Sequence, residues 1–481
     1  MSQPTKLMLD EEARAKLWSR LFEIIEDYMR HVHEARVSPV LDLEKIRALL
    51  APFDFKSALE PLEAVERIVA GLWQYQVHTP HPRYFGLFNP APTTASIAAD
   101  TLVAAFNPQM AAWSHNPFAA EAERHLVRVF GERFGYAIEE TDGTFCSGGA
   151  EANHTALLTA LVHHFPAFSV EGARAIPAPP VFYVSSQSHH SFIKAARLCG
   201  LGTSAVREVE LDENSAMSAE RLASAIKADR EQGRLPFMVI GTAGTTSAGV
   251  IDPLRAIAEV AIDEKLWFHV DAAWGGAAVL VEELRPFLEG IERADSITFD
   301  AHKWLSVPMG AGLYLTRHTK ILEQTFSTAA GYMPRESREF GVHDPYDHSM
   351  QWSRRFIGLK VFLSLAVAGW EGYEAAIRHQ TAMGALMREE LEKSGWKVVN
   401  RTPLPVACFI DEKSNEGADP RYLEAIAREV VREGKTWIST TDMGHGRAVL
   451  RACVTNYRTE AEDVSALIEA LNDARQHIAR R

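Results

Sequence analysis

Short apolar runs alternate with longer stretches of helical periodicity through the middle of the chain. The runs are rich in β-branched and aromatic residues, and strands are expected at residues 181–184, 238–242, 267–270, 296–299 and 312–316. Between them apolar positions recur at helical spacing, and helices are expected at residues 117–134, 151–162, 218–232 and 253–264. This alternation predicts βαβ units, and therefore an α/β fold whose mostly parallel central sheet carries helices on both faces.

The pattern changes on either side of this region. Residues 10–36 place apolar residues at helical spacing, and Ser57 with Glu60 suits a capping box for a helix that ends near Trp73. Residues 325–354 are polar and contain several glycines and prolines. A polar segment of that length in a compact domain is usually functional or disordered. We therefore expect a helical beginning and a functional loop late in the chain.

The C-terminal part has a different order of elements. A helix is expected at residues 355–368, and further short strands and helices are expected at 397–399, 406–410, 449–454, 419–433 and 459–479. The chain should therefore have three parts, a helical N-terminal arm at 1–82, a large α/β domain at 83–368 and a small α+β domain at 369–481.

Composition narrows the class of protein. The 481 residues, 47% of them hydrophobic, are enough for more than one domain with a sizeable core. A net charge of −13 argues against nucleic acid and anionic membranes as partners. The four cysteines form no CxxC motif, and because residues 1–16 lack an apolar core and no window is apolar enough to span a membrane, we expect neither a signal peptide nor a spanning helix. We therefore expect a cytoplasmic protein.

An aspartate and a lysine follow two of the expected strands. Asp271 comes directly after residues 267–270, and His302 and Lys303 come shortly after residues 296–299. The carboxyl ends of parallel strands meet at one edge of a sheet, where ligands bind. Pyridoxal phosphate (PLP) needs a lysine for its Schiff base and an acid beside its pyridine nitrogen. The alternatives are a structural arginine as the partner of Asp271 and a plain surface role for Lys303.

Three further segments could contribute to the same site. Residues 145–153 lead through two glycines into a helix, a pattern that binds anions at the helix N-terminus but also occurs in tight turns without a ligand. His189 follows a strand and could stack on a flat ring or be an ordinary core or solvated histidine. Its neighbour His190 is adjacent in sequence, which is not a metal-ligand spacing, so no metal site is expected. Thr246 follows another strand and could offer a hydroxyl.

These segments together resemble a known family. HVDAAWGG, DAHKWL, SGGAEAN, QSHHS and GTAGTTS occur here in an order and spacing that resemble the group II PLP-dependent amino-acid decarboxylases, and HPRYFGLFNP at 81–90 resembles their substrate-side segment. The resemblance runs from about residue 10 to the end. It implies fold-type I architecture, a homodimer with active sites at the interface, PLP as cofactor, and decarboxylation of an L-amino acid through an external aldimine and a quinonoid.

The resemblance also implies roles around the cofactor ring. Lys303 is the Schiff-base lysine, and Asp271 pairs with the pyridine nitrogen. His189 stacks on one face of the ring, Ala273 lies on the other face, and Thr246 lies close by.

At the phosphate, the resemblance implies that Gly149, Ala150 and His302 hold the cofactor. Asp300 departs from the asparagine that some members have at its position, so its role carries over only weakly.

The family uses a tyrosine on a mobile loop to protonate the substrate Cα. The polar segment 325–354 offers Tyr332 and Tyr346, and we prefer Tyr346, with Tyr332 as the alternative. Some relatives that have lost this tyrosine form aldehydes, so the presence of two candidates favours decarboxylation.

The choice of substrate depends on weaker signals. Phe85, Phe88, Phe106 and Trp113 are candidates for an aromatic pocket and favour an aromatic substrate, whereas Arg83 is the one obvious nearby arginine for an acidic substrate. The alternatives are a decarboxylase of acidic or diamino acids and a carbon–carbon lyase of the sphingosine-phosphate type. A regulatory homologue without catalysis is disfavoured because the lysine, aspartate and histidine are intact.

Overall fold

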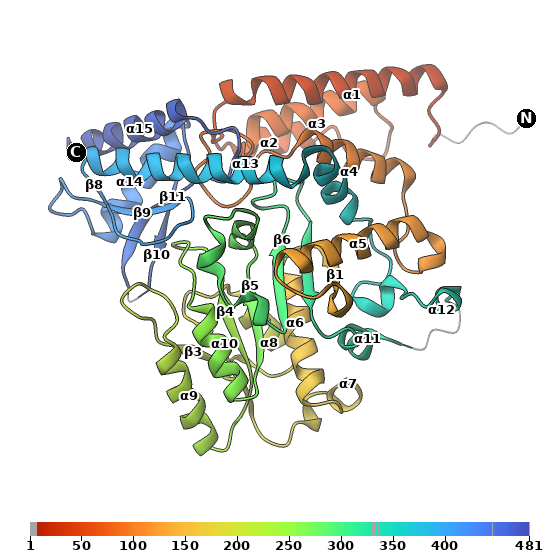
Figure 1. Cartoon of the computed structure of the whole chain (residues 1–481). Helices are drawn as coiled ribbons and strands as arrows, with labels where there is room; N and C mark the ends of the chain where they lie inside the picture. The colour runs from red at the N-terminus through yellow and green to blue at the C-terminus, as the bar shows by residue number, and fades with distance from the viewer. Residues whose placement is uncertain (1–6, 329–332, 335, 445, 481) are drawn as a thin grey trace, which may run out of the picture.

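A seven-stranded sheet forms the centre of the computed structural model, which describes residues 7–328, 333–334, 336–444 and 446–480 (Figure 1). Its strand order is β1-β7-β6-β5-β4-β2-β3. The strands are β1 (Asp142–Cys146), β2 (Pro180–Ser185), β3 (Val206–Val209), β4 (Leu235–Thr242), β5 (Trp267–Asp271), β6 (Ser296–Asp300) and β7 (Gly312–Thr316). Neighbouring strands from β6 to β3 are parallel, and only β7 runs antiparallel to its neighbours β6 and β1. The predicted mostly parallel sheet is confirmed.

Two edge strands depart from the expectation. β1 is not among the expected strands, but it pairs with β7 along its whole length. β3 had not been predicted; it is a four-residue strand whose first three residues are not buried. Edge strands are paired on one side only, so their sequences need not be continuously apolar.

Alternate residues of the strands pack into two cores, one on each face of the sheet. In β2, Val181 and Tyr183 belong to one core, and Phe182 and Val184 belong to the other. The first core includes residues of α5 (Pro117–Arg133), α9 (Ala219–Glu231) and α10 (Leu254–Asp263). The second includes residues of α6 (Gly149–His164), α8 (Ser191–Leu198) and α11 (Ile321–Phe326). Both faces of the sheet are therefore covered by helices, as predicted.

The N-terminal part is helical, with α1 (Glu11–His31), α2 (Leu43–Leu50) and α3 (Pro61–Tyr75). The predicted capping box at Ser57 is wrong, because α3 begins at Pro61 and its N-cap residue, Glu60, makes no side-chain capping bond. Proline favours the first helical turn because its missing N–H would have no partner there. None of these three helices has a buried residue, so the arm leaves apolar side chains exposed.

The helices α4 (Thr94–Phe106) and α5 lie between the N-terminal arm and β1 in the chain, and a long helical segment follows β7 and the polar segment 325–354. α4 packs on α13 (Gly358–Lys393), which reaches towards the C-terminal part (Figure 1). The helix expected at residues 355–368 is present and is interrupted at Gly369, whose backbone is not helical and whose φ of +63° suits glycine; a second helical stretch then runs on to Lys393. The domain boundaries at 82 and 368 stay predictions.

The C-terminal part contains a separate antiparallel sheet of order β10-β11-β9-β8. Its strands are β8 (Trp396–Val398), β9 (Val406–Asp411), β10 (Ser439–Asp442) and β11 (Ala448–Cys453), and its helices are α14 (Pro420–Glu433) and α15 (Ala461–Ala479).

The polar segment 325–354 contains α12 (Glu336–Phe340) and a 3₁₀ turn at Pro345–His348. Among the described residues, no helix combines the length and the apolarity needed to cross a membrane.

Candidate active site

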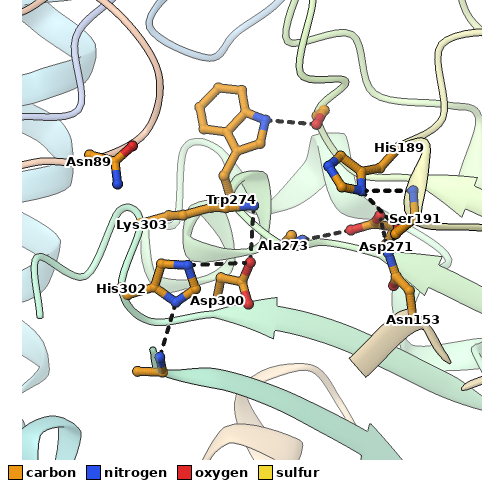
Figure 2. Close-up of polar contacts among 12 residues, drawn as sticks. Asn89, Asn153, His189, Ser191, Asp271, Ala273, Trp274, Asp300, His302 and Lys303 are labelled. Atoms are coloured by element: carbon orange, nitrogen blue, oxygen red, sulfur yellow. Dashed lines mark hydrogen bonds and ion pairs between the residues drawn. The ribbon is translucent and has the colours of Figure 1, made fainter. Parts of the chain in front are cut away.

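The strand ends bring the predicted cofactor residues to one cavity of about 320 Å³. Asp271 ends β5, Asp300 ends β6, and Lys303 follows β6 after a short turn. The residues predicted to contact the cofactor all line this cavity; they are Gly149, Ala150, His189, Thr246, Asp271, Ala273, His302 and Lys303. Figure 2 shows Lys303 and His302 on one side of it and His189 and Asp271 on the other.

Asp271 is held by neutral donors. Its side chain is almost fully buried. One carboxylate oxygen accepts a hydrogen bond of 2.8 Å from Asn153 Nδ2, and the other accepts one of 3.1 Å from the backbone N–H of Ala273 (Figure 2). None of the ion pairs among the described residues involves Asp271, so the structural-arginine alternative finds no support.

Asn153 connects Asp271 to a buried polar network. Its amide also donates to Ser191 Oγ at 3.0 Å, and its carbonyl oxygen lies 3.2 Å from His269 Nε2. Burial lowers the pKa of His269 to about 4, so this imidazole is neutral at physiological pH. A neutral network behind a buried carboxylate leaves the charge of Asp271 to be balanced from the cavity side.

His189 presents a neutral ring to the cavity. Its Nδ1 lies 2.8 Å from Ser191 Oγ, which fixes the orientation of the ring. Burial lowers the pKa of His189, and the nearby Lys303 lowers it further, against the opposing effect of Asp271. An uncharged, oriented imidazole is suited to stacking on a flat aromatic ring.

Lys303 pairs with the buried Asp300, at 3.0 Å from its Oδ2. The other oxygen of Asp300 is buried and has no hydrogen-bond partner among the described residues. His302 Nε2 lies 3.8 Å from Asp300, while His302 Nδ1 accepts from the N–H of Ala311. Burial lowers the pKa of His302, although Asp300 acts in the opposite direction. An amine held by a single carboxylate at a cavity wall is well placed to bind a carbonyl compound covalently.

The start of α6 forms a cradle beside this pair. A Cβ atom on Gly149 would come within 2.7 Å of Asp300 Oδ2, so the position has no room for a side chain. The backbone at the N-terminus of α6 carries the positive end of the helix dipole, which favours a phosphate. The cradle, the lysine and the buried aspartate fit PLP, whose phosphate, aldehyde and pyridine nitrogen need these three kinds of partner.

The sequence interpretation missed two side chains that line this cavity, Asn153 and Trp274, and a third, Arg451, that donates a hydrogen bond to the carbonyl of the lining residue Thr246. Asn153 stood within a recognised motif but had no assigned role. Trp274 stacks on Phe88 with ring centroids 4.2 Å apart, and its indole N–H donates to the carbonyl of Gly244. The guanidinium of Arg451 lies 4.9 Å from the Phe88 ring centroid. Arg451 belongs to β11, and nothing in its sequence context indicated this position.

Of the four predicted pocket aromatics, only Phe88 lies beside Lys303, with 6.0 Å between Lys303 Nζ and the ring centroid. Phe85 is instead buried in the core of the C-terminal sheet. Phe106 is 82% exposed at the end of α4, and the Trp113 ring packs near Phe340. Aromatic residues serve equally well in cores and in pockets, so residue type alone could not assign them.

Tyr346, the preferred proton donor, lies outside this set of residues. Tyr332 falls outside the described residues. Tyr346 is 8% exposed, packs with Ala111, Ala112 and Met333, and is not among the residues that line the Lys303 cavity. Burial raises the pKa of Tyr346, as do two neighbouring aspartates.

Comparisons with known proteins agree with this chemistry. Residues 45–410 match the family model of the pyridoxal-dependent decarboxylase conserved domain. The aromatic-L-amino-acid decarboxylase of Bacillus atrophaeus is 30% identical over 468 residues, covering 95% of this chain and 94% of the relative. The cysteine sulfinic acid decarboxylase of Homo sapiens is 29% identical over 441 residues, covering 89% of each chain. The crystal structure of mouse CSAD has a TM-score of 0.90 at 27% identity, covering 97% of this chain and 99% of that one.

The family match confirms the predicted cofactor and the fold-type I architecture, and it favours carboxyl release over the carbon–carbon lyase alternative. The relatives act on aromatic and on sulfinic amino acids, so they leave the substrate preference open. The chain belongs to the pyridoxal-dependent decarboxylase family and is a carboxy-lyase that uses PLP to decarboxylate an amino acid.

Proposed function

We propose that the preferred substrate is an aromatic L-amino acid. The observation that supports this most directly is the stacked Phe88–Trp274 pair beside Lys303. An aromatic side chain can extend such a pair with favourable ring contacts. Among the described residues no arginine lines the cavity, and Arg83, the candidate for an acidic substrate, pairs with Asp463 at 2.9 Å.

An acidic amino acid is the second candidate. Arg451 is 1% exposed, and its Nη2 has no hydrogen-bond partner among the described residues. A buried guanidinium N–H without an acceptor is costly and would be satisfied by a carboxylate or sulfinate. The cysteine sulfinic acid decarboxylase relative is compatible with this reading.

We propose the following roles for the residues that line the cavity. Bound PLP supplies a conjugated ring that takes up the electron pair left at Cα when CO₂ departs. Lys303 would hold the cofactor covalently and release it to the substrate amine, while Asp271 would hold the proton at the pyridine nitrogen. His189 and Ala273 would cover the two faces of the ring, and Thr246 would lie near it. Gly149, Ala150 and His302 would hold the phosphate.

Tyr346 is proposed to deliver the proton to Cα, with Tyr332 as the alternative donor. Because Tyr346 lies outside the cavity of its own chain, it would act in the site of a second copy. A homodimer is supported by the arm, where Trp18, Phe22 and Ile68 are 46%, 56% and 53% exposed. Burial of these side chains against a partner subunit would remove apolar surface from water.

The deciding experiment measures CO₂ release from the twenty amino acids, 2,4-diaminobutyrate and cysteine sulfinate. We expect the highest kcat/KM for tryptophan, tyrosine or phenylalanine. A preference for aspartate, glutamate or cysteine sulfinate that disappears in Arg451→Met would establish the second candidate instead.

A further inference from the structure

Glu151, in the first turn of α6, fixes the backbone next to the phosphate cradle. Its Oε2 accepts hydrogen bonds from the backbone N–H of Ser147 at 2.8 Å and from Ser147 Oγ at 2.6 Å. Ser147 and Glu151 lie on either side of Gly148 and Gly149, so this carboxylate restrains the glycine turn. Both residues also line the cofactor cavity.

The same carboxylate is bound by a residue 200 positions later. The side-chain amide of Gln351 donates to Glu151 Oε1 at 2.6 Å and to Oε2 at 2.8 Å. With the two donors of Ser147, the amide places three donor groups around one carboxylate. Hydrogen bonds to a charged group are stronger than those between neutral groups. The contact with Gln351 should therefore restrain the side chain of Glu151.

Gln351 belongs to the segment that carries Tyr346. On one side of Gln351, the N–H of Tyr346 donates to the carbonyl of Ala111 at 3.1 Å. On the other side, Arg354 forms a buried, two-point ion pair with Glu123. Between these two anchors, Gln351 connects the segment to the start of α6.

We infer that Gln351 and Glu151 are positioning residues that couple PLP binding to the docking of the segment 345–354. With Gln351 in place, the carboxylate is held against Ser147 and the turn at Gly149 keeps the shape that receives the phosphate. When the segment leaves, Glu151 loses one of its donors and the turn loses part of its restraint. Coupling between two sites is reciprocal. Bound PLP must therefore favour docking of the segment by the same factor by which docking tightens the binding of PLP.

The inference rests on the phosphate position proposed above, and a charge-swap series tests it. Gln351→Glu places two carboxylates together, so we expect the Kd for PLP to rise by at least about fivefold, the lower end of typical coupling. Adding Glu151→Gln to that variant restores an amide–carboxylate pair with the donor and acceptor exchanged. The double variant should return to within about twofold of the wild-type Kd.

Two readouts separate coupling from general damage. Pyridoxal, which lacks the phosphate, should bind to wild type and to Gln351→Glu equally. Hydrogen exchange of the Tyr346 amide should slow when PLP binds to wild type, and this protection should be lost in Gln351→Glu and regained in the double variant. Met350→Glu is the matched control, because it adds the same charge at a neighbouring residue that is 50% exposed.

The outcomes are distinct. Any of four results would overturn the coupling. The Kd for PLP could be unchanged in Gln351→Glu, or the affinity for pyridoxal could fall as much as that for PLP. Met350→Glu could raise the Kd for PLP as much as Gln351→Glu does, or the double variant could fail to regain the wild-type Kd. If Gln351→Glu does not fold, Gln351→Leu, which removes the amide without adding charge, takes its place. Gly149→Ala tests the phosphate position separately, since the added Cβ crowds Asp300. If PLP binds normally to that variant, the proposed cradle is at fault rather than the coupling.

Discussion

Replacing Asp271 with asparagine removes the negative charge of the side chain and keeps its shape nearly unchanged. Both carboxylate oxygens accept hydrogen bonds, from Asn153 and from the N–H of Ala273. An amide offers only one acceptor atom, so one buried donor loses its partner and the free energy of unfolding should fall by about 1–3 kcal/mol. This cost is measurable by urea denaturation of the apo-protein.

The effect on catalysis should be larger than the effect on cofactor binding. A charge-assisted hydrogen bond exceeds a neutral one by about 1–1.5 kcal/mol, which corresponds to a rise of roughly 5- to 15-fold in the Kd for PLP. The negative charge matters most when electrons enter the ring, so kcat for CO₂ release should fall by about 10²- to 10³-fold.

Asp300→Asn provides the matched control, because it makes the same chemical change in the same cavity. Asp300 pairs with Lys303 and not with the network of Asn153. We expect its kcat to fall by less than about tenfold, the value of one hydrogen bond. Near-normal turnover in Asp271→Asn, or an equal loss in both variants, would refute the assignment of Asp271 to the pyridine nitrogen.

Four further predictions address the lysine, the proton donor, the loop and the pH dependence of stability. Borohydride reduction of the holoenzyme should attach PLP to the peptide that contains Lys303, and Lys303→Ala should abolish the adduct; an adduct elsewhere would place the cofactor on another lysine. Tyr346→Phe should lower amine formation by about 10²- to 10⁴-fold with PLP binding intact, and if Tyr332→Phe alone has this effect, Tyr332 is the donor. Trypsin should cleave first at Arg335, which lies outside the described residues, or at the exposed Arg338, and more slowly with a substrate analogue bound; a first cut elsewhere, unaffected by the analogue, would argue against a lid. Burial lowers the pKa of His269 to about 4, so between pH 6.5 and 4 the unfolded chain binds more protons than the folded chain, and the free energy of unfolding decreases as the pH decreases. In urea titrations His269→Asn should remove up to roughly 3 kcal/mol of this loss. An unchanged dependence of stability on pH would contradict this prediction.

The central strands could be predicted because they are buried on both faces. β5 and β6 consist entirely of buried residues, and most of these residues are aromatic or β-branched, the types that favour strands. The missed strands β1 and β3 are edges of the sheet, and both begin with residues that are not fully buried. A short, half-exposed strand leaves a sequence pattern that a turn can also produce.

The sequence predicted the site residues that directly follow the ends of strands. It did not predict those that come from other elements. Lys303 and Asp271 were placed together because parallel strands end at one edge of the sheet. Arg451 and Gln351 reach this region from β11 and from the polar segment 325–354, so only the packing of distant elements brings them near. Periodicity and motif spacing describe neighbours along the chain and cannot report such contacts.

The surroundings of Asp271 give the strongest physical argument for a functional rather than a structural carboxylate. An ionised carboxylate in a buried position is costly unless a positive charge or several donors compensate it. The described residues supply one amide and one backbone N–H, and the histidine behind them is neutral. Two neutral donors position the carboxylate but do not neutralise it. We therefore propose that the balancing charge comes from the cavity side, where the protonated pyridine ring of PLP would supply it.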